Sequence, residues 1–182
     1  MSDFDKIFKK ELMPQLQKEL KLKNKFVAPH LEKIVINSGV GRISREKKSL
    51  DSIIEGISLI TGQKPVLTKA RKAISAFKIR EGLPIGIKVT LRNKRMYDFF
   101  EKLIKVVLPR MRDFDGLNLD SLDKHGNLTI GLKEVSAFPE LSRQQKTEYI
   151  FGLEITLVTK TPTRDAALLL FKKLGLIFKN NK

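Results

Sequence analysis

Positive charge is concentrated in the middle of the chain, where it could bind the phosphates of a nucleic acid. Between Gln63 and Arg95 there are ten basic residues and one acid, Glu81, so the segment has a net charge of ten minus one, or +9. The basic residues are Lys64, Lys69, Arg71, Lys72, Lys78, Arg80, Lys88, Arg92, Lys94 and Arg95. More than half of the chain's net charge of +16 therefore lies in one segment, as expected for a surface that contacts phosphates.

The sign of the charge alone leaves three kinds of partner open: a nucleic acid, an anionic membrane surface or an acidic protein. The longest apolar run, from Ala166 to Phe171, is too short to cross a bilayer. The charged residues near the N-terminus do not resemble a secretion signal. We expect no membrane partner and a cytoplasmic location, and a peripheral membrane or acidic-protein binder is the alternative that only the first predicted helix could support. The chain has no cysteine, which removes disulfides, thiolate catalysis and cysteine zinc sites.

Residues that could carry out catalysis are poorly placed. The two histidines, His30 and His125, lie in apparent loops without further metal ligands at short spacing. Gly39-Val40-Gly41 resembles the start of a dinucleotide motif, but Ser44 stands at the third glycine position, and Gly62-Gln63-Lys64 does not complete a phosphate-binding loop. The sequence therefore predicts no enzyme, no cofactor and no metal. The alternatives are an RNA-modifying enzyme, which would need a buried titratable cluster, or another basic RNA-binding protein.

Hydrophobic spacing predicts both helices and strands. Apolar residues three and four apart indicate helices over 4–22, 48–59, 97–108 and 164–174, with Pro14 as a possible kink and Gly62 and Gly175 after helix ends. Alternation of apolar and polar residues indicates strands over 31–38, 84–92, 128–132 and 151–160. No strict alternation of strand and helix follows, so we expect an α+β fold. Its mainly antiparallel sheet would be covered by helices on one face and open for RNA on the other, within a single domain of residues 1–182.

The outward positions of two predicted strands are polar or cationic. Lys33 and Asn37 alternate with Ile34 and Ile36, while Lys88, Thr90 and Arg92 alternate with the apolar residues of the next strand. These five side chains could share one sheet face, where cations would contact phosphates and short polar groups would contact riboses or bases. The face lacks the aromatic pair of an RRM, which favours recognition of folded RNA by shape and backbone. An ordinary solvated face is the alternative.

Residues 68–82 form a second basic feature. Phe77 and Ile79 stand there among cations, with too few alternating apolar residues for a buried strand. We interpret the segment as an exposed, partly ordered hairpin loop. Phe77 could stack on a nucleobase or pack in a small core under the loop, and the sequence leaves both open.

Several strings in the chain resemble a known family. They are LEKIVINSGVG (31–41), TGQKPVLTKARKAISAFKIREGLPIGIKVTLR (61–92), MYDFFEKL (96–103), PRMRDFDGL (109–117) and FPE (138–140). Together, in this order and spacing, they resemble the bacterial large-subunit ribosomal proteins of the universal L-five family, over essentially the whole chain. Asp115, the turn of residues 123–127 and Ile177 depart from the family pattern.

The resemblance implies a non-enzymatic protein that anchors 5S rRNA in the central protuberance of the ribosome. In that family, positions matching Lys33, Asn37, Gln63, Thr90 and Arg92 contact 5S rRNA, and we add Lys64 and Lys88 to this site. The hairpin is implied to reach the P-site tRNA through Lys69, Arg71, Lys72, Phe77, Lys78 and Arg80. Further implied partners are 23S-type rRNA, neighbouring large-subunit proteins and a small-subunit head protein contacted through an intersubunit bridge.

Overall fold

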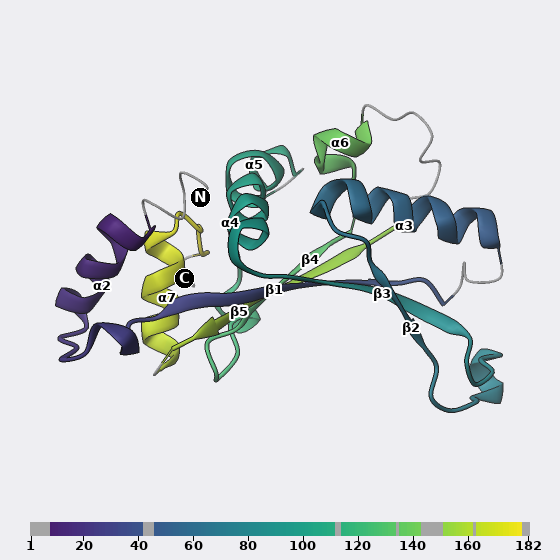
Figure 1. Cartoon of the computed structure of the whole chain (residues 1–182), viewed down its shortest axis with the longest axis horizontal. Helices are drawn as coiled ribbons and strands as arrows, with labels where there is room; N and C mark the ends of the chain where they lie inside the picture. The colour runs from purple at the N-terminus through teal and green to yellow at the C-terminus, as the bar shows by residue number, and fades with distance from the viewer. Residues whose placement is uncertain are drawn as a thin grey trace. The chain divides into compact units, whose positions relative to one another are not determined.

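A computed structural model describes residues 8–41, 46–111, 114–133, 135–142, 151–161 and 163–179. Five strands among these residues form an antiparallel sheet in the order β2-β3-β1-β5-β4 (Figure 1). The strands are β1 (His30–Gly39), β2 (Val66–Lys69), β3 (Pro84–Leu91), β4 (Leu128–Leu132) and β5 (Leu153–Lys160). The predicted α+β class is confirmed.

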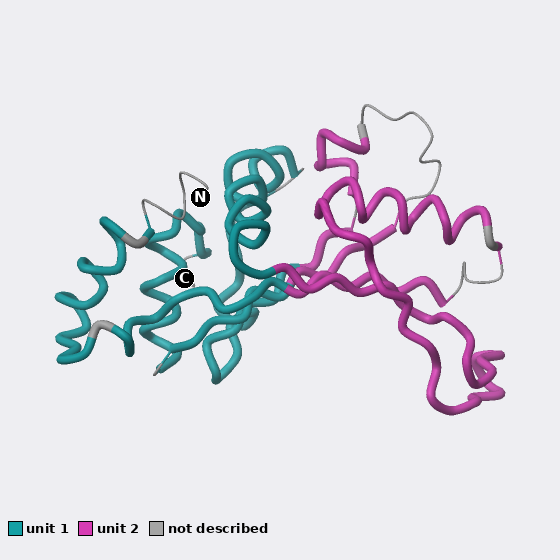
Figure 2. The backbone as a smooth tube through the Cα atoms, viewed as in Figure 1, with its two compact units in different colours: residues 1–34, 92–130, 156–182 teal, residues 35–91, 131–155 magenta. Residues whose placement is uncertain are grey.

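The chain forms two compact units (Figure 2). Unit 1 contains residues 1–34, 92–130 and 156–182, and unit 2 contains residues 35–91 and 131–155. Each unit is assembled from segments that are far apart in the sequence. The single domain expected from the sequence stays a prediction.

Unit 1 contains most of the helices around its own core. They are α2 (Met13–Glu19), α4 (Asn93–Lys102), α5 (Leu108–Arg110) and α7 (Arg164–Lys173). Phe8, Phe100 and Phe171 are fully buried, and the rings of Phe8 and Tyr97 lie 6.0 Å apart. Burying each phenyl ring contributes roughly 2–3 kcal/mol to folding. These aromatic residues therefore carry a large share of the hydrophobic stabilisation of unit 1.

Unit 2 packs α3 (Lys47–Thr61) and the short α6 (Pro139–Ser142) on one side of its strands (Figure 1). Ile53 and Ile57 of α3 are buried, as is Phe138 beside α6. At Gly56 the helix comes so close to Leu141 that an added Cβ would lie 3.3 Å from its side chain. The apolar face of α3 thus covers the unit 2 core.

The alternation predicted for the strands is confirmed. In β3, Ile87, Val89 and Leu91 are buried, while Lys88 is exposed and Thr90 is half-buried. Alternation in β1 begins at Ile34, because Leu31 and Ile34 are both buried with Glu32 and Lys33 between them. In β1, β3, β4 and β5, one face therefore packs in the core and the other is more accessible.

Two helix ends follow the sequence signals. Gly62 ends α3 with φ of 65°, a left-handed conformation that glycine adopts without steric cost. Thr163 caps α7, since its hydroxyl accepts a hydrogen bond from the backbone N–H of Ala166 at 3.3 Å. Residues 4–7 of the first predicted helix, and Pro162 just before α7, lie outside the described residues.

Two predicted helices are less regular than expected. Residues Phe8–Leu12 and Leu103–Val107 form π-helical turns, and each ends two residues before a proline, Pro14 or Pro109. Proline donates no hydrogen bond and its ring collides with the carbonyl four residues earlier, so a wider turn before it relieves the conflict. The helix predicted over 97–108 extends beyond its predicted end, because α5 continues through Pro109 to Arg110.

Strand β2 was not predicted, because all four of its residues are exposed and show no alternation. It is held by antiparallel pairing with β3, where Val66 lies opposite Lys88 and Thr68 lies opposite Gly86. The Thr68 hydroxyl occupies the space next to Gly86, at 2.6 Å from where a Cβ on that glycine would be. This pair fixes how closely β2 approaches β3.

Replacing Gly86 by alanine is expected to lower the free energy of unfolding by about 1 kcal/mol, because the new methyl group collides with Thr68 Oγ1. Thr68→Ala removes that oxygen, so the double variant should regain most of the loss. Urea unfolding of the parent, both single variants and the double variant measures the coupling. An equal cost of Gly86→Ala in both backgrounds would contradict the contact.

Candidate nucleic-acid interface

The accessible strand face of unit 2 contains three of the predicted RNA-binding residues. Asn37 of β1 and Thr90 of β3 are half-buried, and Lys88 of β3 is exposed. Since β1 and β3 are neighbours and their intervening residues are buried, these three side chains lie on the same side of the sheet. The structure thus brings together a cation, an amide and a hydroxyl, which is a set suited to phosphate and ribose contacts.

Gln63 and Lys64 follow the end of α3, and Gln63 is bonded to β3. The side-chain amide nitrogen of Gln63 donates a hydrogen bond to the backbone carbonyl of Thr90 at 3.3 Å. The Thr61 hydroxyl donates to the Gln63 carbonyl at 3.0 Å. These bonds hold Gln63 beside β3, and the next residue, Lys64, is exposed. Gln63 does not belong to a strand, so its position could not be found by alternation.

In unit 1, Lys33 and Arg92 both lie near Glu32, a residue that was not predicted from the sequence. Glu32 Oε1 lies 3.5 Å from Lys33 Nζ and 3.7 Å from Arg92 Nη1. The Glu32 side chain is 44% exposed, so water screens both ion pairs. Arg92 is not in β3 as predicted but stands at the residue before α4, with extended backbone. The three residues form what we call the Glu32 cluster.

Replacing Glu32 by glutamine is expected to strengthen binding to RNA about threefold, because one negative charge next to Lys33 and Arg92 is removed. Distances of 3.5 and 3.7 Å are too long for good hydrogen bonds, so Glu32 does not fix the orientation of either cation. Filter binding to 5S rRNA measures the change. Glu101→Gln on α4, which removes a carboxylate bound to Lys105, is the matched control. Weaker binding by the Glu32 variant would show that the carboxylate positions the cations.

Backbone hydrogen bonds join the two arms of the hairpin between β2 and β3 up to its tip. Ala70 and Leu83 are joined by an N–H to carbonyl bond of 2.8 Å, and Ile74 and Ile79 exchange two such bonds of 2.9 and 3.1 Å. Residues Ser75–Phe77 form a single 3-10 turn, and Lys78 follows it with φ of 53°. The hairpin thus has paired backbone on both arms, and its partial order stays a prediction.

The cations of the hairpin point to a polyanionic partner. Lys69, Arg71, Lys72, Lys78 and Arg80 are exposed, and no carboxylate in the described part of the chain forms an ion pair with them. Phe77 is 73% exposed, so the alternative that it packs in a small core under the loop is wrong. An exposed phenyl ring next to uncompensated cations suits contact with nucleic acid.

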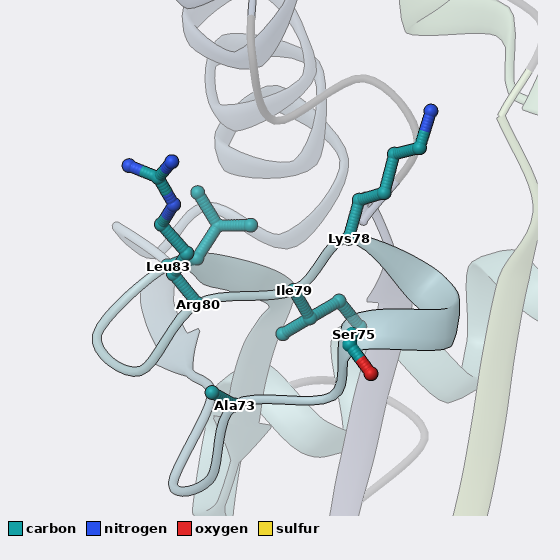
Figure 3. Close-up of a pocket in the computed structure, with 6 residues that line it drawn as sticks. All are labelled: Ala73, Ser75, Lys78, Ile79, Arg80 and Leu83. Atoms are coloured by element: carbon teal, nitrogen blue, oxygen red, sulfur yellow. The ribbon is translucent and has the colours of Figure 1, made fainter.

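One side of the hairpin tip is hollowed. The hollow has a volume of about 730 Å³ and is lined by Ala73, Ser75, Lys78, Ile79, Arg80 and Leu83. In the view of Figure 3, Lys78 and Arg80 extend to one side of the hairpin and the Ser75 hydroxyl to the other. The lining has no carboxylate or imidazole that could act as a general acid or base. The charged side chains that line the hollow are the cations Lys78 and Arg80.

The positions that depart from the family pattern have structural roles in unit 1. Asp115 lies 3.8 Å from Lys179 Nζ, and the Ile177 carbonyl accepts the Leu117 N–H at 2.8 Å. Asp123 Oδ1 accepts the backbone N–H groups of His125 and Asn127 at 2.8 and 2.7 Å. Slight burial would raise the pKa of Asp123, but the hydrogen bonds from Asn127 and His125 and the charge of His125 outweigh it and lower the pKa. The turn of residues 123–127 is thus closed by its own carboxylate.

Two kinds of feature are absent from the described ranges. Their histidine and carboxylate side chains form no cluster of three or more that could hold a metal ion. Helices within the same ranges are too short or too polar to span a bilayer.

Comparison with known proteins covers nearly the whole chain. Residues 24–80 match the family described as Ribosomal protein L5, and residues 84–178 match the model for the C-terminus of the same ribosomal family. The large ribosomal subunit protein uL5 of Trichodesmium erythraeum is 46% identical over 182 residues, all of both chains. The same protein of Symbiobacterium thermophilum is 47% identical over 178 residues, 98% of each chain. That of Fusobacterium nucleatum is 44% identical over 98% of this chain and 97% of its own.

Proposed function

This chain belongs to the uL5 family of large-subunit ribosomal proteins, and from that premise we propose that it binds and anchors 5S rRNA. Family membership makes it a structural constituent of the ribosome and not an enzyme, as the sequence predicted. The proposed 5S rRNA contacts are Lys33, Asn37, Gln63, Lys64, Lys88, Thr90 and Arg92.

The observation that carries this proposal is the accessible strand face of unit 2. Its cation, Lys88, and the adjacent Lys64 form no ion pair with any carboxylate of the described residues. Asn37 and Thr90 supply short hydrogen-bonding groups on the same side of the sheet. The face has no exposed aromatic ring among the proposed contacts, so it suits the backbone of a folded RNA better than splayed bases. In unit 1, the two cations of the Glu32 cluster, Lys33 and Arg92, are the further proposed contacts.

An electrophoretic titration tests the proposal. The protein should bind 5S rRNA at least tenfold more tightly than an unrelated RNA duplex of equal length. Because each neutralised phosphate contributes a slope of roughly 0.7 to 0.9 to the plot of log affinity against log salt, the salt dependence should be steep. Equal affinity for both RNAs would refute a specific 5S rRNA function.

The hairpin is proposed to contact the P-site tRNA through Lys69, Arg71, Lys72, Phe77, Lys78 and Arg80. The exposed cations, the exposed phenyl ring and the hollow at the tip support this assignment. The contacts with 23S-type rRNA, with neighbouring large-subunit proteins and with a small-subunit head protein across an intersubunit bridge are proposed from the family resemblance.

Replacing Phe77 by alanine is expected to change the affinity for 5S rRNA by less than twofold, because the proposed hairpin site is separate from the proposed 5S site. The side chain is 73% exposed, so the free energy of unfolding should also remain within about 0.5 kcal/mol. Filter binding with labelled 5S rRNA provides the measurement. A tenfold loss would show that the hairpin belongs to the 5S rRNA site.

A further inference from the structure

The connection between α2 and β1, residues 20–29, exposes an aromatic side chain far along the sequence from the hairpin. Phe26 is 78% exposed, which makes it the most exposed large apolar side chain of the described residues, and Val27 beside it is 48% exposed. The segment runs from the end of α2 to the start of β1 in unit 1 (Figure 1). We call it the α2–β1 loop. Neither the strand face nor the hairpin includes it.

Hydrogen bonds hold this loop in a defined conformation. The Leu22 N–H donates to the Gln17 carbonyl at 3.0 Å, which ties the loop to α2. The Phe26 N–H donates to Asn24 Oδ1 at 3.0 Å, and the Val27 N–H donates to the Asn24 carbonyl at 3.2 Å. The following residues, Ala28 and Pro29, are buried. The backbone that carries Phe26 is therefore fixed at both ends, so the ring is presented at little entropic cost.

Positive charge surrounds the exposed ring in sequence. Residues 18–25 contain four lysines, at positions 18, 21, 23 and 25, and one glutamate, a net charge of four minus one, or +3. That glutamate, Glu19, is already paired with Lys173 Nζ. Lys18, Lys21 and Lys23 are exposed, and no described carboxylate forms an ion pair with them. The loop therefore combines an aromatic face with uncompensated cations.

We propose that the α2–β1 loop is a separate binding site for single-stranded or loop RNA. An unstacked base would lie on the Phe26 ring while Lys21 and Lys23 contact the flanking phosphates. Bases within a duplex are already stacked, so the ring selects an unpaired nucleotide. A protein partner would need a larger apolar area than Phe26 and Val27 offer, and it would have to neutralise the lysines. The assignment to RNA rests on membership of the ribosomal family and not on the proposed 5S rRNA contacts.

Fluorescence tests the stacking directly, because the chain has no tryptophan. Phe26→Trp introduces a single fluorophore at the site, and Ile177→Trp places one at another exposed apolar position of unit 1, 64% exposed, as the control. Titration with a short single-stranded oligoadenylate at low salt should quench only the tryptophan at position 26. When Lys21→Ala and Lys23→Ala are added to the Phe26→Trp variant, the oligoadenylate concentration at half-maximal quenching should rise about tenfold. No quenching, or equal quenching at both positions, would overturn the proposal.

Two controls separate this inference from the function proposed above and from other partners. Phe26→Ala should change the affinity for 5S rRNA less than twofold. If the protein fails to prefer 5S rRNA but position 26 is still quenched, the proposed function fails and the loop site stands. A benzophenone amino acid at position 26 should form crosslinks to RNA in irradiated large subunits. Crosslinks to protein alone, or quenching by anionic lipid vesicles and not by oligoadenylate, would overturn the inference.

Discussion

Replacing both Lys33 and Arg92 by alanine is expected to weaken binding to 5S rRNA about 100-fold, the largest effect on binding that we anticipate. A charge-assisted contact to a phosphate contributes about 1.5 kcal/mol, which corresponds to about tenfold for each cation. Both side chains are accessible and are paired only loosely with Glu32. Their removal should therefore take away the two proposed RNA contacts without leaving a buried charge in the protein.

Titrations of 5S rRNA at several salt concentrations measure this effect. The slope of log affinity against log salt should fall by about 0.7 to 0.9 for each lost cation. Lys105→Ala is the matched control, because Lys105 is an exposed lysine of unit 1 that pairs with Glu101 at 2.6 Å. It should change the affinity by less than threefold. A double variant with native circular dichroism and unchanged affinity would refute the assignment of Lys33 and Arg92.

Replacing Gly126 by alanine is expected to lower the free energy of unfolding by about 3 kcal/mol, the largest effect on stability. The φ angle of Gly126 is +81°, a conformation that is strained for any residue with a Cβ atom. That atom would also lie 2.4 Å from Thr161 Cγ2 and 2.8 Å from the Ala167 Cβ. Backbone strain and overpacking therefore add at this position.

Gly175→Ala separates the two contributions, since Gly175 has a φ of +93° but its nearest neighbour, Ile104, lies 3.7 Å from the added Cβ. Only the backbone cost of about 1 kcal/mol should appear there. Urea unfolding of both variants provides the comparison, because both glycines belong to unit 1. Equal losses for the two variants would contradict the close packing around Gly126.

The fold was predictable where one face of an element is buried. In β3, buried residues alternate with polar ones. In α3, apolar residues recur three and four positions apart, so both patterns can be seen in the sequence. β2 has no such pattern, since all four of its side chains are exposed and only pairing with β3 makes it a strand. The π turns depend on the conflict between a proline and the preceding carbonyls, which hydrophobic spacing does not register.

The candidate site was predictable to a similar degree. Asn37, Lys88 and Thr90 lie on an accessible strand face as alternation predicted. Glu32 was missed because its contact with Arg92 joins residues sixty positions apart and exists only after β1 and the start of α4 meet. Phe26 carries no periodic signal, and its exposure follows from a loop conformation that Asn24 fixes locally.

Stripping 5S rRNA from large subunits tests the central proposal most directly. The protein should sediment with intact large subunits in a sucrose gradient. When 5S rRNA is released by chelating magnesium, the protein should leave with it as a complex. Retention of the protein on the particle that has lost 5S rRNA would contradict the account.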